Sequence, residues 1–463
     1  MIRVDTSVTA EELEQIINEE ANRDETVKLE AGEYRFDHAL TIARSDVSLV
    51  GEGSDETRLT FTDDALKEND DNAILVTGET ADTIGKIESD VDEGENVLKL
   101  DDADELEAGD TIRIAQDNDT EYLDEIDDHD WRELDSPLRT SMAKVTGVDG
   151  DYVTLDRGVH FDFDHHEAEV TRVDSADDVS LRSFSVGFDL GEPDDSEFSN
   201  ELDDLASYHA IEYADTTDGE LDDVSVINGP STAFEFTRSL DMDADSLTAE
   251  GSFNKGSGGN GYAFELRESY DGTFDDLRDS GMRHGVLFAS WHSSVGNDID
   301  VTRTDRDINF HGGSDHDNRV HVQHSIREAD NDEISTTLWV NEGESFGAPT
   351  DMTTNEVTFD DVVGSRRDDV VRGSDEGVTL DGGAGSDTLY GGDGDDVLDP
   401  GYGWGEDRLD GGEGYDIARF EGDSDDYIIV KQDDSVSVEG NGIEATLVDI
   451  EELAFDDEAL SIG

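Results

Sequence analysis

The sequence predicts an all-β protein built around a parallel β-helix, because two series of strand-like residues recur at about one spacing. In the first series an apolar pair flanks one other residue, which is the period-2 pattern of a strand with one buried face. Its members begin at residues 211, 234, 264, 286, 308 and 338, so their spacings are 23, 30, 22, 22 and 30 residues.

The second series runs between the members of the first. It comprises Val179, Val224, Leu247, Leu277, Ile299 and Val320, with spacings of 45, 23, 30, 22 and 21 residues. If the first interval spans two turns, both series repeat about every 22 residues, and each turn lays its strands on those of the turn below. A β-sandwich also has many short strands, but it does not need one spacing to recur in two series.

The N-terminal residues predict a helix that covers one end of this core. In "TAEELEQIINEE" (9–20), Thr9 is the expected N-cap and Glu12 closes a capping box, while Leu13, Ile16 and Ile17 form one apolar face. Alternating residues follow over 27–61. This opening resembles the first turns of the pectate-lyase-like superfamily of right-handed β-helices, over about residues 8–360. The resemblance implies the fold but not the reaction, since that architecture hosts lyases, hydrolases, epimerases and non-catalytic viral spikes.

Residues 86–170 interrupt the repeat and predict a β-hairpin insertion. The segments "GDTIRIAQ" and "AKVTGVDGDYVTLDRGVHFDF" look like hairpin strands, and an "EYLDEIDDHDWRELD" acidic loop lies between them.

The C-terminal part contains nine-residue units of the form G-G-x-G-x-D-x-U-x. They are "GGAGSDTLY", "GGDGDDVLD" and "GGEGYDIAR", with a lengthened "PGYGWGEDRLD" before the last. Asp387, Asp396 and Asp416 hold the sixth position, and we expect them to point at one place, with Asp407 as the equivalent in the lengthened unit.

These units predict a Ca²⁺ site. Gly382, Gly391 and Gly411 open the regular units, and glycine permits backbone conformations that turn carbonyl oxygens inward. Ca²⁺ takes six to eight oxygen ligands, so carboxylates that would repel one another become ligands of a shared cation. Asp369, in "GSRRDDVVRG", begins the array in degenerate form.

This segment resembles the RTX family of Ca²⁺-binding β-rolls. The tail after it resembles the cap that often follows such rolls in exported proteins, which implies secretion without an N-terminal signal peptide. We therefore expect an N-terminal cap and first coils, a β-hairpin insertion, a main β-helix, an RTX-like β-roll and a C-terminal β cap, at residues 1–85, 86–170, 171–362, 363–420 and 421–463.

The composition limits the possible functions. The 463 residues carry a net charge of −92 with only 31 Lys and Arg, of which 7 are Lys, yet 34% of the chain is apolar. This predicts a folded protein adapted to high salt or abundant Ca²⁺, from a halophile or its virus, and no basic patch for nucleic acid. There is no Cys, no apolar run of about 20 residues for membrane insertion, and no N-terminal signal peptide. We expect an extracellular or virion location.

Alternation along the strands places a candidate site on their outward positions. Glu212, Glu235 and Glu265 would stack about 4.8 Å apart and repel by roughly 3 kcal/mol per pair, unless salt, a cation, Arg267 or a proton compensates. A carboxyl whose pKa is raised suits general acid catalysis. The predicted catalytic residues are Glu235, Glu265, Asp307 and His311, and the predicted substrate-binding residues are Arg267, Arg283, His284 and Trp339. A salt-adapted acidic surface is the alternative.

A further motif, "FDHHE" (163–167), resembles a run in alginate C5-epimerases. That resemblance implies catalytic roles for Asp164 and His166, although His165 replaces the proline of the family pattern and the run lies in the insertion.

Two functions remain open from the sequence. The first is a calcium-stabilised β-helix that binds, and cleaves or modifies, a polysaccharide or cell-surface glycan as a lyase, glycoside hydrolase or epimerase. The second is a non-catalytic viral tail spike, virion protein or adhesin, for which a homotrimer is compatible although no heptad pattern supports it.

Overall fold

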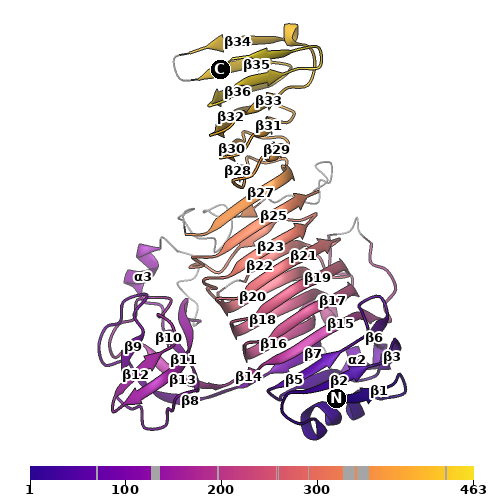
Figure 1. Cartoon of the computed structure of the whole chain (residues 1–463), viewed down its shortest axis with the longest axis vertical. Helices are drawn as coiled ribbons and strands as arrows, with labels where there is room; N and C mark the ends of the chain where they lie inside the picture. The colour runs from indigo at the N-terminus through magenta and orange to yellow at the C-terminus, as the bar shows by residue number, and fades with distance from the viewer. Residues whose placement is uncertain are drawn as a thin grey trace.

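The computed structural model shows an elongated, nearly all-β molecule whose coils stack along its long axis (Figure 1). It describes residues 1–68, 71–126, 136–194, 198–256, 258, 260–289, 291–326, 339–340, 354–432 and 435–462.

Two parallel sheets form the β-helix. Sheet 1 contains β1 (Ile2–Val4), β2 (Glu25–Leu29), β3 (Gly32–Phe36), β5 (Val47–Val50), β6 (Thr57–Phe61), β15 (Val179–Phe188), β17 (Glu220–Gly229), β19 (Asp243–Ser252), β21 (Thr273–Ser280), β23 (Asp298–Arg303), β25 (Arg319–Ser325) and β27 (Glu356–Val363). Sheet 2 contains β4 (Leu40–Ile42), β7 (Asn72–Thr77), β16 (His209–Thr217), β18 (Thr232–Leu240), β20 (Tyr262–Tyr270), β22 (His284–Phe288), β24 (Ile308–Phe310) and β26 (Trp339–Val340), with β14 (Ala176–Asp177) beside β16.

The predicted strand spacing in sheet 2 is confirmed by its register. Ile211 lies opposite Phe234, Phe234 opposite Phe264, and Val286 opposite Ile308. These side chains are buried, and the rings of Phe234 and Phe264 stack with centroids 5.4 Å apart. Burial of such stacked apolar rows supplies the main stabilisation of the coil.

Three intervals were predicted wrongly. Leu277 lies opposite Val301 rather than Ile299, and Ile308 lies opposite Trp339 rather than the predicted residue 338. The 45 residues between Val179 and Val224 do not make two turns, because β15 pairs directly with β17 and Phe184 lies opposite Val224. The interval is one coil with a long excursion that includes the 3₁₀ turn η2 (Asp203–Leu205). A loop of any length leaves the register of the flanking strands unchanged, so spacing alone could not separate the two cases.

A ladder of buried asparagines fixes one turn between the sheets. The Asn297 side-chain NH₂ donates to the Asn318 Oδ1 at 2.9 Å, and that of Asn318 donates to the Asn355 Oδ1 at 2.9 Å. Each amide satisfies the next, so the polar turn can be buried without loss of hydrogen bonds.

The predicted N-terminal cap is confirmed. Helix α1 (Ala10–Gln15) continues into the π-helical turn η1 (Ile16–Glu20), and Thr9 and Glu12 form the reciprocal capping box with both bonds at 3.2 Å. Leu13 and Ile17 are fully buried against the first coils. Helix α2 (Asp63–Glu68) packs beside β6.

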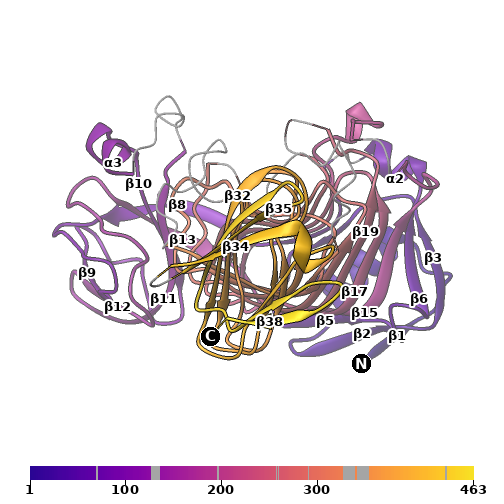
Figure 2. The same cartoon turned by 90° about the horizontal axis from the view of Figure 1, so that it is seen from above.

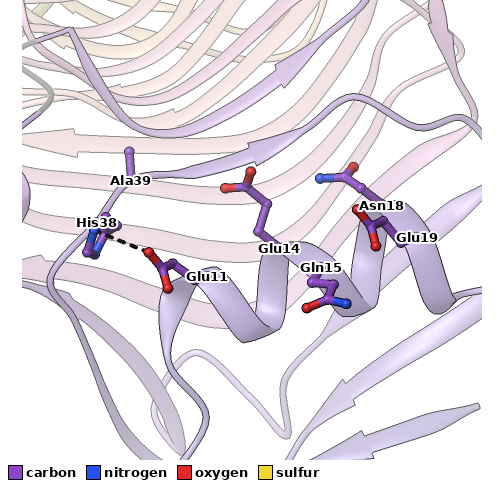
Figure 3. A pocket seen from close by; sticks show the side chains of 7 residues that line it. All are labelled: Glu11, Glu14, Gln15, Asn18, Glu19, His38 and Ala39. Atoms are coloured by element: carbon purple, nitrogen blue, oxygen red, sulfur yellow. Dashed lines mark ion pairs between the residues drawn. The ribbon is translucent and has the colours of Figure 1, made fainter.

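A hollow of about 570 Å³ lies beside α1, lined by Glu11, Glu14, Gln15, Asn18, Glu19, His38 and Ala39 (Figure 3). Its polar side chains have a structural task. The Thr41 N–H donates to Glu14 at 3.2 Å, and Asn18 bonds the backbone of Thr41 and Ala43 at 2.8 and 3.0 Å. These bonds satisfy β4, the edge strand of sheet 2, which would otherwise offer free backbone groups to another chain.

The insertion is larger than the predicted hairpin. It is an antiparallel sheet of β8 (Glu79–Lys86), β9 (Val97–Lys99), β10 (Thr111–Gln116), β11 (Arg139–Asp149), β12 (Tyr152–Leu155) and β13 (Glu169–Asp174), with helix α3 (Thr120–Glu125). It lies on one side of the β-helix, away from α2 (Figures 1 and 2). Its hydrophobic core includes Leu240 and Tyr270, the last residues of β18 and β20, and Val295 from the loop after β22. Part of the predicted acidic loop lies outside the described residues.

Stacked aspartates also hold the insertion in place. Asp218, Asp241 and Asp271 occupy the same left-handed turn position in successive coils, with φ of 51°, 56° and 54°. Asp tolerates this conformation better than most residues, but stacking brings the carboxylates together. Lys144 pairs with Asp218, and Arg157 bonds both Asp241 and Asp271 at 2.6 Å.

A second ionic contact is more deeply buried. Glu268 accepts hydrogen bonds from Arg113 of the insertion at 2.7 and 3.0 Å, and His292 lies 3.0 Å away. Burial opposes ionisation of Glu268, but Arg113 and His292 outweigh it and lower its pKa to about 2. The insertion is therefore docked through both apolar and charged contacts.

The β-roll continues the helix along the same axis (Figure 1). Sheet 1 extends through β29 (Thr379–Asp381), β31 (Val397–Asp399), β33 (Ile417–Arg419), β37 (Glu452–Ala454) and β38 (Ala459–Ser461). The opposite face contains β28 (Val370–Arg372), β30 (Thr388–Gly392), β32 (Gly405–Gly412), β36 (Ile443–Val448), β35 (Val436–Gly440) and β34 (Tyr427–Lys431), which the turn η3 (Ser424–Asp426) precedes. None of the helices in the described part of the chain could span a membrane.

We expect Arg157→Ala to loosen the insertion, because it removes the cation that Asp241 and Asp271 share and leaves only His160, 3.2 Å from Asp271, beside them. The loss should be about 1–3 kcal/mol, less than for a fully buried pair since both carboxylates are partly exposed. Denaturant unfolding and limited proteolysis at the junctions of the insertion measure it. Arg172→Ala, which removes a pair with Asp174 on the surface of the insertion, is the control. Equal stability of Arg157→Ala and wild type would contradict this account of the docking.

Candidate functional sites

The outer face of sheet 2 carries the predicted glutamate ladder. Glu212 lies opposite Glu235, and Glu235 lies opposite Glu265, so the three side chains stand in register on β16, β18 and β20. Glu235 and Glu265 are only 4% and 2% exposed. Two buried carboxylates at this spacing need nearby positive charge.

Arg267 and His209 supply that charge. The Arg267 guanidinium donates from Nε to Glu235 at 3.0 Å and from Nη2 to Glu265 at 2.5 Å. The His209 Nδ1 lies 2.9 Å from the other oxygen of Glu235. The Asn72 side chain donates to Glu212 at 3.0 Å. We call Glu212, Glu235, Glu265, Arg267 and His209 the carboxylate cluster.

Within this cluster the pKa values of Glu235 and Glu265 are shifted in opposite directions. Burial opposes ionisation of Glu235, but His209 and Arg267 outweigh it and lower its pKa to about 2. Burial raises the pKa of Glu265, and the charge of Glu235 adds to that effect against the attraction of Arg267. Burial disfavours a charged His209, but Glu235 and Glu212 raise its pKa well above the usual value. The arrangement favours an ionised Glu235 beside a Glu265 that holds its proton more tightly.

A second group, which we call the histidine cluster, lies on the next coils and comprises Arg283, His284, Asp307, His311 and Tyr262. The Asp307 carboxylate lies 2.8 and 3.0 Å from the His284 Nδ1, which fixes the imidazole as a carboxylate–histidine pair. The Tyr262 ring lies 5.4 Å from the His284 ring. Burial, with His284 and Arg283 nearby, lowers the pKa of His311 to about 4, so His311 is neutral near pH 7.

Tyr262 connects the two clusters. It lies opposite His284 in the register of β20 and β22, and the charges of Glu265, Arg283 and Arg267 act on its hydroxyl. The outer face of sheet 2 therefore holds a proton-donor candidate in Glu265, an oriented imidazole in His284 and an aromatic ring between them.

Several predicted site residues do not line an open groove in the way that inward–outward alternation along the strands predicted. Asp307 is fully buried and paired with His284, not aligned with Glu265 two coils away. Arg267 is engaged by Glu235 and Glu265, so its guanidinium holds carboxylates of the protein itself. The backbone of Trp339 pairs with the core residue Ile308, and its side chain lies outside the described part.

His209 and Tyr262 were missed by the sequence reasoning. Each stands at the start of its strand, before the alternating triplet, where two successive residues both turn into the core: Ala210 and Ile211 in β16, and Ala263 and Phe264 in β20. An alternation pattern that allows for two successive inward-facing residues at the start of the strand would have placed His209 and Tyr262 on the outer face.

The motif that resembles the epimerase run lies in the insertion, not on sheet 2. Asp164 accepts a hydrogen bond from the Gln116 amide at 2.7 Å and lies 3.4 Å from Arg139. His166 stands in a left-handed turn with φ of 66°. Two further histidines lie at the insertion contact, where His292 bonds Glu268 and His316 bonds the His160 carbonyl.

In the β-roll the predicted metal ligands form two rows rather than one place. One row contains Asp369, Asp387 and Asp407: each backbone N–H donates to the next carboxylate, at 2.8 and 2.9 Å. The other contains Asp396 and Asp416, linked in the same way at 2.9 Å. Two nine-residue units make one coil, so successive units lie on opposite edges.

The donor set in both rows fits a hard cation. One oxygen each of Asp387, Asp396 and Asp416 is buried without a hydrogen-bond partner among the described residues. A Cβ at Gly382, Gly391 or Gly411 would stand 2.8, 2.1 or 2.6 Å from these oxygens, so only glycine leaves the space open. Buried anionic oxygens with an open position are what Ca²⁺ coordination requires.

The acidity of these carboxyls agrees with this view. Burial raises the pKa of Asp387 to about 8, with Asp369 and Asp407 adding to the effect. Burial also raises the pKa of Asp407 and Asp416 to about 6 and that of Asp396 above its usual value. Without a cation, the fold thus resists the ionised form of its own ligands.

A family model matches this segment. It is the RTX calcium-binding nonapeptide repeat, found in four copies over residues 363–398 and 403–418. The match confirms the predicted RTX-type repeats, which are calcium-binding units.

No curated protein sequence matches the chain. Among solved structures, the tailspike protein gp49 of Pseudomonas phage LKA1 is similar with a TM-score of 0.54 at 12% identity, over 96% of this chain and 71% of that one. The tailspike gp61 of Pseudomonas phage phi297 has a TM-score of 0.47 at 12% identity, over 86% of this chain and 65% of that one. An alginate lyase of Paenibacillus has a TM-score of 0.39 at 8% identity, over 89% of this chain and 95% of that one.

At this identity the likeness to gp49 concerns the fold. Together with the stacked parallel sheets, it confirms the predicted all-β class. The chain folds as a parallel β-helix, and its residues 363–398 and 403–418 match the RTX calcium-binding nonapeptide repeat.

Proposed function

We propose that this protein binds a polysaccharide along the outer face of sheet 2 and cleaves it there, and that Ca²⁺ stabilises its β-roll. The observation that carries the proposal is the pair Glu235 and Glu265, whose pKa values are pushed in opposite directions on one face. Pairs of this kind commonly mark acid–base sites.

The proposed roles follow from the two clusters. Glu265 retains its proton and gives it to the leaving glycosidic oxygen, while ionised Glu235 and Arg267 hold its carboxyl in place. His284, oriented by Asp307, accepts a proton from water or from the sugar. Tyr262 provides a ring beside the bond that breaks, and Arg283 offers positive charge at the same place.

A second candidate function is glycan binding without cleavage, as in a spike or adhesin. The low exposure of Glu235, Glu265 and Asp307 favours it, because each already has a partner in the protein and substrate must displace or approach these groups. Either function places the protein outside a cell or on a virion surface.

We expect Glu265→Gln and His284→Ala to lower product formation by about 100-fold or more, because each removes one proton-transfer group. Product is measured as reducing ends, and as ultraviolet absorbance of an unsaturated uronate where elimination occurs. Cleavage by wild type should decline as pH rises through the raised pKa of Glu265, whereas Glu235 stays ionised above about pH 2.

Asp298→Asn is the control, since Asp298 lies on sheet 1, outside both clusters, in an exposed ion pair with Arg319. It should keep activity and melting temperature. Glycan binding by wild type without any product would favour the second candidate, and full activity of both test variants would exclude this face as the catalytic site.

We propose Asp387, Asp407, Asp396 and Asp416 as the Ca²⁺ ligands. In the metal-free roll, the raised pKa values of Asp387, Asp407 and Asp416 make the folded state bind protons more tightly than the unfolded state. Their contribution to the free energy of unfolding is therefore complete below about pH 4 and is lost as the pH rises through 6 to 8. Ca²⁺ should reverse this trend, because it binds the ionised groups. Thermal unfolding between pH 4 and 8, with Ca²⁺ or with chelator, measures both curves.

Asp387→Asn with Asp396→Asn is the control for this prediction. The double variant should lose most of both the pH dependence and the response to Ca²⁺. A chelated wild-type roll that is most stable at pH 8 would contradict the assignment of these carboxyls.

We also propose that the chain is adapted to high salt. Its net charge is −92, and coil stacking brings carboxylates together, as at Asp178, whose pKa is raised by burial and by Asp218 and Asp46. Lowering salt from about 1 M to 0.1 M extends the screening length from about 3 to 10 Å. Circular dichroism should then show loss of β-sheet, with recovery on addition of Mg²⁺ or Ca²⁺. A chelated protein that stays folded at 0.1 M salt would refute this adaptation.

A further inference from the structure

The lengthened unit of the β-roll presents two aromatic side chains to solvent. Asp396 and Asp407 are 11 residues apart, whereas Asp387 and Asp396, and Asp407 and Asp416, are 9 apart. The extra residues lie between β31 and β32. There Trp404 is 91% exposed and Tyr402 is 49% exposed. Large aromatic side chains at such exposure commonly mark interaction sites.

The backbone of this turn is fixed rather than loose. Gly401 and Gly403 have φ of 82° and 114°, which glycine alone adopts readily. The Tyr402 N–H donates to the Gly383 carbonyl at 2.6 Å, and the Gly401 N–H donates to Asp399 at 2.8 Å. A Cβ at Gly401 would stand 2.1 Å from the Gly383 oxygen. The coil below therefore fixes the backbone of the turn at Gly401 and Tyr402.

The charges around the turn indicate the chemistry of a ligand. Glu406 is exposed beside Trp404, and the nearby cations are already paired: Arg408 with Asp410 at 2.7 Å and Arg419 with Asp399 at 2.8 Å. The surface thus offers aromatic faces and carboxylate acceptors. It repels anionic polymers, nucleic acid and anionic lipid.

A neutral sugar ring matches this combination. Its C–H face is apolar and flat enough to cover an indole, and its hydroxyls donate hydrogen bonds that carboxylates accept. Neither interaction requires positive charge from the protein.

We propose that Tyr402 and Trp404 form a glycan-binding site for neutral pyranose chains, separate from the outer face of sheet 2. Its two ends adjoin Asp396 and Asp407, which belong to the two carboxylate rows. Ca²⁺ bound to those rows would hold both ends of the turn, so removal of Ca²⁺ should loosen the site.

The test compares binding of dextran and of a soluble β-1,3-glucan with binding of polygalacturonate, by affinity electrophoresis and by tryptophan fluorescence. All measurements use the full chain at fixed salt, with Ca²⁺ or with chelator. We expect wild type to bind at least one neutral glycan in Ca²⁺, and Trp404→Ala to weaken that binding about tenfold or more, as for an aromatic hot spot. Trp404→Phe should restore part of it, and chelation should weaken the wild type.

Tyr415→Ala is the matched control. Tyr415 is also exposed on the roll, but its hydroxyl donates to Glu452 at 2.8 Å, and its loss should leave binding unchanged. Equal losses in Tyr415→Ala and Trp404→Ala would overturn the site, as would failure of wild type to bind either neutral glycan. A Trp404-dependent dimer in gel filtration, without glycan binding, would assign the two aromatic residues to contact with a second copy instead.

These outcomes are separable from those for sheet 2. Glu265→Gln and His284→Ala should keep the binding that depends on Trp404, and Trp404→Ala should keep cleavage of short oligosaccharides at the sheet 2 face. Loss of both properties in every variant would overturn the separation of the two sites.

Discussion

In-register stacking in an acidic chain is the constraint on which the rest of this structure depends. Parallel coils set equivalent residues about 4.8 Å apart, so a carboxylate in one coil meets a carboxylate in the next. The chain has 123 acidic residues and 31 Lys and Arg, so cations are scarce. The structure places them where carboxylates are buried: Arg267 and His209 between the glutamates of sheet 2, and Arg157 between the aspartates of the insertion contact. In the roll no side-chain cation is bonded to the ligand carboxylates among the described residues, and the geometry there fits calcium.

This view links the candidate active site to the fold. Arg267 bonds carboxylates of two coils at once, while His209 lowers the pKa of Glu235 and burial raises that of Glu265. A pair of carboxyls suited to proton transfer thus arises from the same charge compensation that lets the coils stack. Arg113 and Glu268 show the same chemistry at the docking surface of the insertion, where it has a purely structural result.

The sequence allowed the coil, its register and the calcium units to be predicted, because apolar spacing and the glycine–aspartate pattern are local. The sequence did not allow the lengths of the loops between strands to be predicted, because a loop of any length leaves the register of its flanking strands unchanged. The interval from Val179 to Val224 shows this. Strict alternation also misplaced Asp307 and overlooked His209, because the strands of sheet 2 start at a corner where two consecutive residues, such as Ala210 and Ile211, face inward. The division of the roll aspartates into two rows depends on two units per coil, which a single unit does not reveal.

Sheet 1 runs without interruption from the helix into the roll, because Asp361, Val362 and Val363 of β27 pair with Thr379, Leu380 and Asp381 of β29. The roll therefore covers the final edge of a long parallel sheet. Opening of the roll would expose that edge as a template with free backbone donors and acceptors. The β-roll therefore also protects the last strand of the β-helix from pairing with a second chain.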